Sequence, residues 1–275
     1  MFRYEYMVIA FVVAILLGIT FPLLGQTVVY KKLSSSGDAL AHSALAGVAI
    51  GLVSGMNPLW ISIISCIVSF ILIDLLRHKF GKHAEIGVVV ILSAAIALTG
   101  ILSGYASATN FDSYLFGDIL LIKKSELWVV IALTVIAIAF FLLTYHRQLH
   151  SLYSEEEAWI HHVPVRALNL LHSILFALTV AIGAKMVGSL VVSSMLVLPT
   201  AAALLWKKGY RSTTLLGLGY SLVSMSLGIV VSYYLDWRSG ATSVGIAVVL
   251  LLLTLLAKGL IILRNKGKKK TANPA

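Results

Sequence analysis

Asp38 and His42 are the two side chains of this sequence best suited to chemistry within an apolar segment. They are four residues apart, which on an α-helix places both on one face with their Cβ atoms about 6 Å apart. At that separation a carboxylate oxygen and an imidazole nitrogen can share one divalent cation. Zn²⁺ accepts such oxygen and nitrogen ligands at about 2.0–2.2 Å, usually four in all. One chain therefore offers two ligands, and a twofold axis between two copies would supply two more.

A structural role for the pair is the alternative: Asp38 would cap its helix, and His42 would be a hydrogen-bonded interior histidine. The surrounding residues favour function, because small side chains allow another helix to approach closely, as expected for a central helix that lines a path. These small neighbours are Ala39, Ala41, Ser43, Ala44, Ala46 and Gly47.

The chain that must position the pair has the composition of a polytopic membrane protein. It has 275 residues, of which 59% are hydrophobic and 12% charged, and its mean hydropathy is +0.97. Soluble domains average about 45–50% apolar and about 25% charged residues. The net charge of +10 comes from basic residues in short loops between apolar runs, which excludes nucleic-acid binding as its main explanation.

The apolar runs predict eight to nine transmembrane helices and hence an all-α membrane protein. Each run is close to the roughly 20 residues that cross a bilayer, and backbone polar groups in lipid must be paired within the segment. The runs are 7–29, 39–56, 58–76, 84–103, 127–145, 167–184, 186–205, 212–234 and 242–263. We expect one transmembrane domain over residues 1–265, followed by a basic tail over 266–275.

Charge predicts the orientation, since short loops rich in Lys and Arg stay in the cytoplasm. With nine spans the basic clusters fall at every second loop, which places the C-terminus inside and the N-terminus outside. With eight spans one terminus would change side.

The predicted cytoplasmic connection 146–166 contains a short amphipathic helix. Ser154 is a natural N-cap, and Glu157 three residues later completes a capping box. Pro164 ends the segment, because the residue before a proline is disfavoured in a helix. A solvated loop helix is the alternative to a docking role.

The other polar groups in the apolar runs have simpler explanations. We expect Asp74 to pair with Arg77, His172 to be a hydrogen-bonded interior histidine, and Lys185 to extend toward the membrane interface. Cys66 is the single cysteine, so the chain contains no disulfide.

Three catalytic motifs are absent from the sequence: a phosphate-binding loop, HExxH and GxSxG. The chain therefore reads as a conduit and not as an enzyme. Its driver would be an ion gradient or a separate ATPase on the cytoplasmic side.

Four segments in order resemble the membrane permease subunits of ABC importers for zinc and manganese, and the match covers nearly the whole chain. They are SGDALAHSALAGVAIGL, YLFGDIL, VGSLVVSSMLVLPTAAALL and DWRSGATSVGIAVVLLLL. The resemblance implies a fold similar to the vitamin B12-type importer permeases and a location in the cytoplasmic membrane. It also implies a homodimer, two copies of a separate cytoplasmic ATPase and an extracytoplasmic metal-binding protein.

The resemblance also assigns roles to residues. Asp38 and His42 match the family positions proposed to hold the transported metal, and no permanently bound cofactor is implied. Asp118, in the outer FGD turn, is a further candidate for contact with the ion, with a structural turn role as the alternative. The segment that matches the family's ATPase-coupling helix consists of Ser154, Glu155, Glu156, Glu157, Ala158, Trp159, Ile160, His161, His162 and Val163.

The Asp–His and FGD segments resemble those of zinc permeases more than those of manganese permeases, although an aspartate with a histidine suits either ion. Two other classes stay open at this point. One is a secondary metal transporter driven by an ion gradient, and the other is a non-transporting assembly or receptor subunit.

Overall fold

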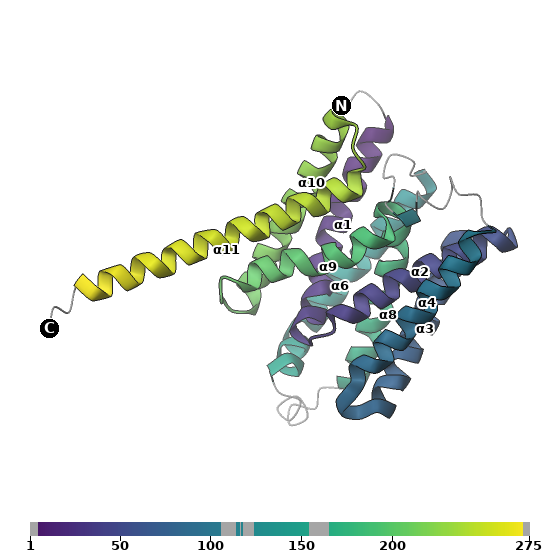
Figure 1. The fold of residues 1–275 in the computed structure, drawn as a ribbon, viewed down its shortest axis with the longest axis horizontal. Coiled ribbons are helices and arrows are strands. Elements are labelled where there is room, and N and C mark those ends of the chain that lie inside the picture. The colour runs from purple at the N-terminus through teal and green to yellow at the C-terminus, as the bar shows by residue number, and fades with distance from the viewer. Residues whose placement is uncertain (1–4, 106–113, 116, 118–123, 154–164, 272–275) are drawn as a thin grey trace.

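The structure is a computed structural model that describes residues 5–105, 114–115, 117, 124–153 and 165–271. Within those residues the chain is helical, with a short 3₁₀ turn between two of the helices (Figure 1). The elements are α1 (Glu5–Tyr30), α2 (Ser34–Ser54), α3 (Pro58–Phe80), η1 (Gly81–His83), α4 (Ala84–Ser103), α6 (Lys124–Tyr153), α8 (Val165–Val187), α9 (Ser189–Leu204), α10 (Tyr210–Leu235) and α11 (Ser239–Thr271).

Eight of the described helices are long and apolar enough to cross a membrane, and α9 is a shorter apolar helix. The predicted all-α membrane protein with eight to nine spans is therefore confirmed. Pro22 in α1 and Pro199 in α9 lie inside their helices. Membrane helices tolerate proline because neighbouring helices and side chains can satisfy the backbone groups that it frees.

The α2–α3 connection shows how local sequence sets the ends of two helices. Gly55 ends α2 in the left-handed conformation, with φ of 70°, which glycine adopts without a steric penalty. The Asn57 side chain then accepts a hydrogen bond from the Leu59 amide, and Pro58 occupies the first turn of α3. Asparagine at the N-cap and proline directly after it are the residues favoured for a helix start.

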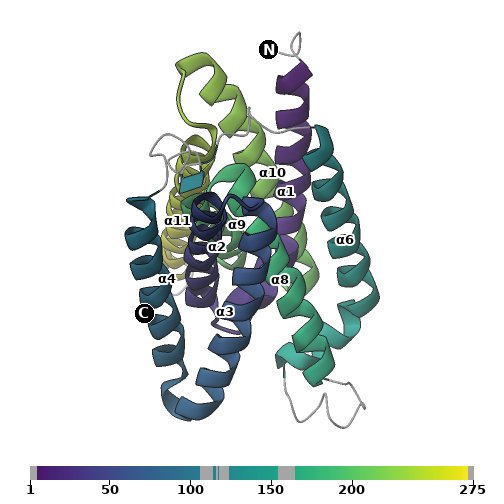
Figure 2. The same cartoon turned by 90° about the vertical axis from the view of Figure 1, so that its right-hand side faces the viewer.

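The helices α2 and α11 mark the two extremes of burial. In α2, 72% of the most apolar 18-residue stretch is buried. The helix packs against α3, α4, α8 and α9. Figure 2 shows α2 near the middle of the bundle, in front of α9. In α11 only 11% of the corresponding 18-residue stretch is buried, and the helix runs outward from the bundle (Figure 1).

Three predicted boundaries differ from the structure. The break that was expected at Lys185 lies at Gly188, whose φ of 100° excludes most other residues. The helix α6 continues to Tyr153, eight residues beyond the end of the apolar run that predicted it. The helix α2 begins at Ser34, five residues before the start of the apolar run that predicted it.

Candidate metal site

Asp38 and His42 lie in the second and third turns of α2, in the half that follows the basic turn at Lys31 and Lys32. The Asp38 Oδ1 and His42 Nε2 atoms are 4.0 Å apart. The helix starts four residues before Asp38, with Leu33 at its N-cap. The alternative in which Asp38 caps the helix is therefore wrong.

The distance between the two donor atoms is close to that of a shared cation. Two ligands at about 2.1 Å from a tetrahedral Zn²⁺ lie about 3.4 Å from each other. Small side-chain rotations would bring the Asp38 oxygen and the His42 nitrogen from 4.0 Å to that separation. The geometry of the pair is thus compatible with a shared divalent ion without any change in the backbone.

The pair is accessible although its helix is the most buried span. The Asp38 side chain is 49% exposed and that of His42 is 22% exposed. Leu40, Ser43 and Gly47 face α3 instead, on the side of α2 roughly opposite the pair at 3.6 residues per turn. One face of α2 is therefore held against the bundle, and the other presents the two candidate ligands.

The contact between α2 and α3 is close because both helices carry small residues. A Cβ atom built on Gly47 would lie 2.6 Å from the Ser62 Cα atom. The Ser65 hydroxyl donates to the Ser43 carbonyl at 2.8 Å, and the Cys66 thiol to the Leu40 carbonyl at 3.4 Å. The predicted close approach of another helix is confirmed at Gly47, and these bonds set the rotation of α2.

No group of three or more His, Cys, Asp and Glu residues placed to hold a metal occurs in the part of the chain that the structure describes. Asp38 and His42 thus supply two candidate ligands within those residues. A complete coordination shell needs ligands from water, from another chain or from outside the described ranges.

Two of the sequence predictions concern residues outside the described ranges: Asp118, and the coupling segment from Ser154 to Val163. The flanks of both are described. Gly117 has φ of 67° and is packed so tightly that a Cβ atom would overlap the backbone at Val187. Gly117 therefore meets the α8–α9 junction, a contact that hydropathy and spacing along the sequence did not indicate.

The ends of α6 and α8 that flank the coupling segment lie at the same end of the bundle (Figure 2). That end also carries the turn between α3 and α4. The chain thus leaves α6 and enters α8 at the end of the bundle that carries the α3–α4 turn.

The other polar residues of the apolar runs have partners that the sequence did not indicate. Asp74 pairs with His78 at 3.8 Å, and not with Arg77. Lys185 forms an ion pair with Glu126, so its ammonium group is held by a carboxylate. The prediction that Asp74 pairs with Arg77 is wrong. Both Arg77 and His78 lie within about one helical turn of Asp74, and spacing alone does not choose between these two partners.

His172 is buried, with 8% of the residue exposed, and its ring stacks on Phe176. Neither ring nitrogen forms a hydrogen bond within the described residues. The Leu24 backbone is close enough to His172 for a weak hydrogen-bonding contact, which does not meet the geometry of a full hydrogen bond. The prediction of an interior histidine is therefore confirmed, with a weak contact to the Leu24 backbone in place of a full hydrogen bond.

Comparison with known proteins places these observations in a family. The model of the ABC 3 transport family matches residues 3–258. A probable metal transport system membrane protein of Treponema pallidum is 36% identical over 93% of this chain and 96% of its own length.

Two further relatives carry the names of different metals. A manganese transport system membrane protein of Listeria monocytogenes is 27% identical over 92% of this chain and 91% of its own length. A high-affinity zinc uptake system membrane protein of Haemophilus influenzae is 28% identical over 89% of this chain and 96% of its own length.

The fold also matches a solved structure, PsaBC from Streptococcus pneumoniae in complex with a Fab. The TM-score is 0.82 at 23% identity, covering 92% of this chain and 91% of the other. The arrangement of helices is thus shared with that protein.

Proposed function

The chain belongs to the ABC 3 transport family. We propose that it is the membrane permease subunit of an ATP-driven importer of a divalent transition metal, with zinc as the favoured ion and manganese as the next candidate. The observation that carries this proposal is the Asp38–His42 pair. A carboxylate and an imidazole in a membrane span are costly to place there, and such groups mark substrate paths by default.

The exposed face of the pair supports a site completed by a second copy of the chain. Two copies of Asp38 and His42 around a twofold axis would supply four ligands, the number usual for Zn²⁺. Two carboxylates would balance the charge of one divalent ion. A transport site must bind strongly enough to admit the ion and weakly enough to release it, and a site shared between two chains can open when they move apart.

The proposal places the energy source on other chains. The sequence has no phosphate-binding loop, so ATP would be hydrolysed by a separate cytoplasmic ATPase, two copies per permease dimer. The residues from Ser154 to Val163 would couple its movement to the permease. An extracytoplasmic binding protein would deliver the ion on the opposite side, with the C-terminus in the cytoplasm.

The preference for zinc rests on the amino-acid sequences of the Asp–His and FGD segments, which resemble those of zinc permeases more than those of manganese permeases. Relatives named for manganese and for zinc match at nearly equal identity, which supports the class of ion and leaves the element to experiment. Most sites built from nitrogen and oxygen ligands bind Zn²⁺ more tightly than Mn²⁺. We therefore expect zinc to compete with manganese for the Asp38–His42 site.

Uptake of radioactive zinc and manganese by proteoliposomes, which contain the permease with its ATPase and binding protein, tests the proposal. Asp38→Ala and His42→Ala should each lower ATP-dependent uptake by at least about ten-fold, because even indirect partners of metal ligands contribute ten- to hundred-fold. Co-purification of the ATPase shows that each variant still assembles. Unchanged uptake by both variants would exclude the pair from the path.

The same vesicles distinguish the alternative driver. Omission of ATP should abolish uptake, whereas dissipation of proton and sodium gradients should leave it unchanged. Uptake that continues without ATP and stops when the gradients are dissipated would identify a secondary transporter and overturn the ATP-driven proposal.

A further inference from the structure

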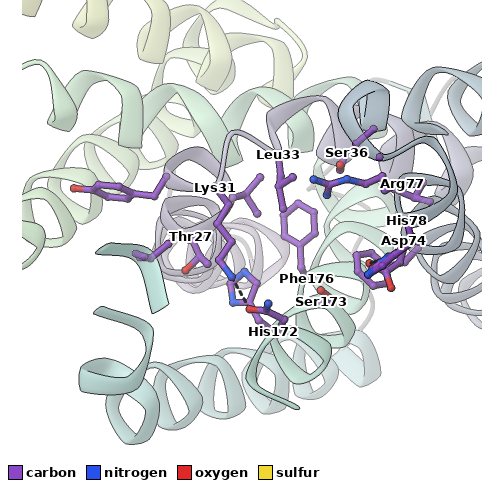
Figure 3. Close-up of a pocket in the computed structure, with 18 residues that line it drawn as sticks. Thr27, Lys31, Leu33, Ser36, Asp74, Arg77, His78, His172, Ser173 and Phe176 are labelled. Atoms are coloured by element: carbon purple, nitrogen blue, oxygen red, sulfur yellow. Dashed lines mark hydrogen bonds and ion pairs between the residues drawn. The ribbon is translucent and has the colours of Figure 1, made fainter. Parts of the chain in front are cut away.

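A cavity of about 810 Å³ lies at the end of the bundle that carries the α1–α2 turn and the end of α3 (Figure 3). Its polar wall includes Lys31, Ser36, Arg77 and His172, and its apolar wall includes Phe70 and other hydrophobic side chains. Volumes of about 300–1,000 Å³ are typical of sites for small organic ligands. The cavity is therefore large enough for an amphiphilic ligand.

The cavity is separate from the Asp38–His42 site. Ser36 lines it, and Asp38 lies two residues later, about 200° further around α2 at 3.6 residues per turn. The two positions are thus on nearly opposite sides of the helix. An occupant of this cavity does not depend on the proposed metal path.

Two polar side chains of the cavity wall are buried without a hydrogen-bond partner in the described residues. The Ser36 hydroxyl belongs to a residue that is 4% exposed, and both nitrogens of His172 are unpaired in a residue that is 8% exposed. Buried polar groups are nearly always hydrogen-bonded, so each exception needs an explanation. A ligand in the cavity that accepts hydrogen bonds would provide it for both residues.

The charges of the wall favour an anion. Lys31 donates to Asn169 at one side of the cavity, and Figure 3 shows the Arg77 guanidinium reaching into the cavity on the side of Ser36. None of the ion pairs among the described residues involves Arg77. The one carboxylate of the wall, Asp74, lies 3.8 Å from His78, and the two cations Lys31 and Arg77 still leave the wall with a net positive charge.

The start of α2 adds to this preference. Leu33 and Ser36 line the cavity, and no side chain caps the first turn of the helix. A helix N-terminus carries partial positive charge and unpaired amides, which favour phosphate. Arginine suits phosphate oxygens because its planar group can donate two parallel hydrogen bonds. A cation would instead be repelled by Lys31 and Arg77.

We propose that this cavity is a binding site for a phosphate group, held by Arg77 and the Ser36 hydroxyl, with Lys31 adding positive charge to the wall. The apolar wall formed by Phe70, Ile73 and Phe176 suits the chains of an anionic phospholipid, while free phosphate would use the polar wall alone. The two sources share the same chemistry and differ in their need for the apolar wall.

Binding to the full-length permease in a neutral detergent tests the proposal, with phosphatidylglycerol, phosphatidylcholine and inorganic phosphate as separate probes. Native mass spectrometry measures lipid binding, and the thermal unfolding midpoint at constant ionic strength measures phosphate binding. We expect the wild type to prefer phosphatidylglycerol over phosphatidylcholine by about ten-fold or more, because the choline ammonium of phosphatidylcholine offsets the charge of its phosphate and would be repelled by Lys31 and Arg77.

Arg77→Gln should remove most of this preference. The matched control is Lys79→Gln, which removes one positive charge from the same end of α3 at an exposed residue outside the cavity wall. Ser36→Ala gives a test with opposite signs: it should raise the stability of lipid-free protein, by removing an unpaired buried hydroxyl, and lower the stabilisation that the anion produces.

Selective binding of phosphatidylglycerol that depends on Arg77 supports the site with lipid as its source. Stabilisation by inorganic phosphate with the same dependence supports it with free phosphate as the source. Equal binding of both lipids with no effect of phosphate would overturn the proposal, and so would equal losses in Arg77→Gln and Lys79→Gln.

Discussion

The helices α2 and α3 each carry an aspartate followed four residues later by a histidine, and the two pairs have almost the same internal geometry. Asp38 and His42 approach to 4.0 Å, and Asp74 and His78 to 3.8 Å. Spacing alone would thus nominate both as metal-binding pairs. Their surroundings separate them.

The pair on α3 behaves as a surface pair. The side chains of His78 and Asp74 are 81% and 57% exposed, and the Nδ1 atom of His78 lies 2.9 Å from the Asp74 backbone carbonyl. That nitrogen is engaged by its own helix. The pair on α2 is less exposed and belongs to a helix that the bundle holds on its other side. The comparison teaches that a helix supplies the donor distance, while its place in the bundle decides how exposed the donors are.

The largest effect is expected from removing each pair in turn. The double variant Asp38→Ala/His42→Ala should lose at least about ten-fold in metal uptake, whereas Asp74→Ala/His78→Ala should stay within about two-fold, as expected for exposed groups away from the path. Uptake by matched amounts of assembled transporter measures both. Similar losses in the two double variants would show that the bundle does not distinguish the pairs.

The second effect concerns the contact that sets the rotation of α2. Gly47→Val should lower the free energy of unfolding by about 1–3 kcal/mol, the usual effect of overpacking, because a Cβ atom there would lie 2.8 Å from the Ile61 carbonyl oxygen. Reversible unfolding in mixed detergent micelles measures it.

Gly100→Ala on α4 is the matched control for that change, since nothing lies within 4 Å of the added Cβ atom. We expect this variant to be unchanged or more stable by up to about 1 kcal/mol, the difference in helix propensity between the two residues. Equal destabilisation of both variants would mean that the α2–α3 approach has no special importance.

A smaller effect is expected at the hydrogen bond between the two helices. Ser65→Ala removes the bond to the Ser43 carbonyl and should lower stability by about 0.6 kcal/mol, the mean for such bonds between membrane helices. Ser54→Ala, whose hydroxyl bonds only within α2 at an exposed position, should change stability less. The reverse order would argue against the bond as a contribution to the position of α2.

The smallest effect is expected at the α3 pair itself. Asp74→Asn should change the free energy of unfolding by no more than about 0.5 kcal/mol, since exposed pairs four residues apart on a helix contribute little. The same unfolding assay applies. A loss several times larger would indicate that Asp74 has a partner besides His78 and would make the two pairs more alike.

Most of the fold was predictable because hydrophobic runs and backbone pairing in lipid leave few options. The exceptions have local causes. The break between α8 and α9 lies at Gly188, where the backbone has a φ of 100°. A hydropathy pattern gives no information about backbone conformation, so it could not locate this break. The extension of α6 to Tyr153 was missed because a helix can continue past the apolar run that identifies it.

The candidate metal pair was also predictable, since its spacing and small neighbours are properties of one segment. Its alternatives were not. Only the start of α2 at Ser34 excluded Asp38 as a cap, and only the packing around His172 showed a buried ring without a formed hydrogen bond. The cavity beside Arg77 was missed because its walls come from segments far apart in the sequence.

By itself, the sequence determined which segments form apolar helices and that Asp38 and His42 share one helix face, because both follow from composition and from the period of a helix. Tertiary structure alone decided which Asp–His pair lies on the central helix and which on an exposed end. It also decided that Arg77 lines a cavity without forming an ion pair with Asp74. Exposure and partners depend on neighbouring helices, and the order of residues along one helix does not specify how those neighbours pack.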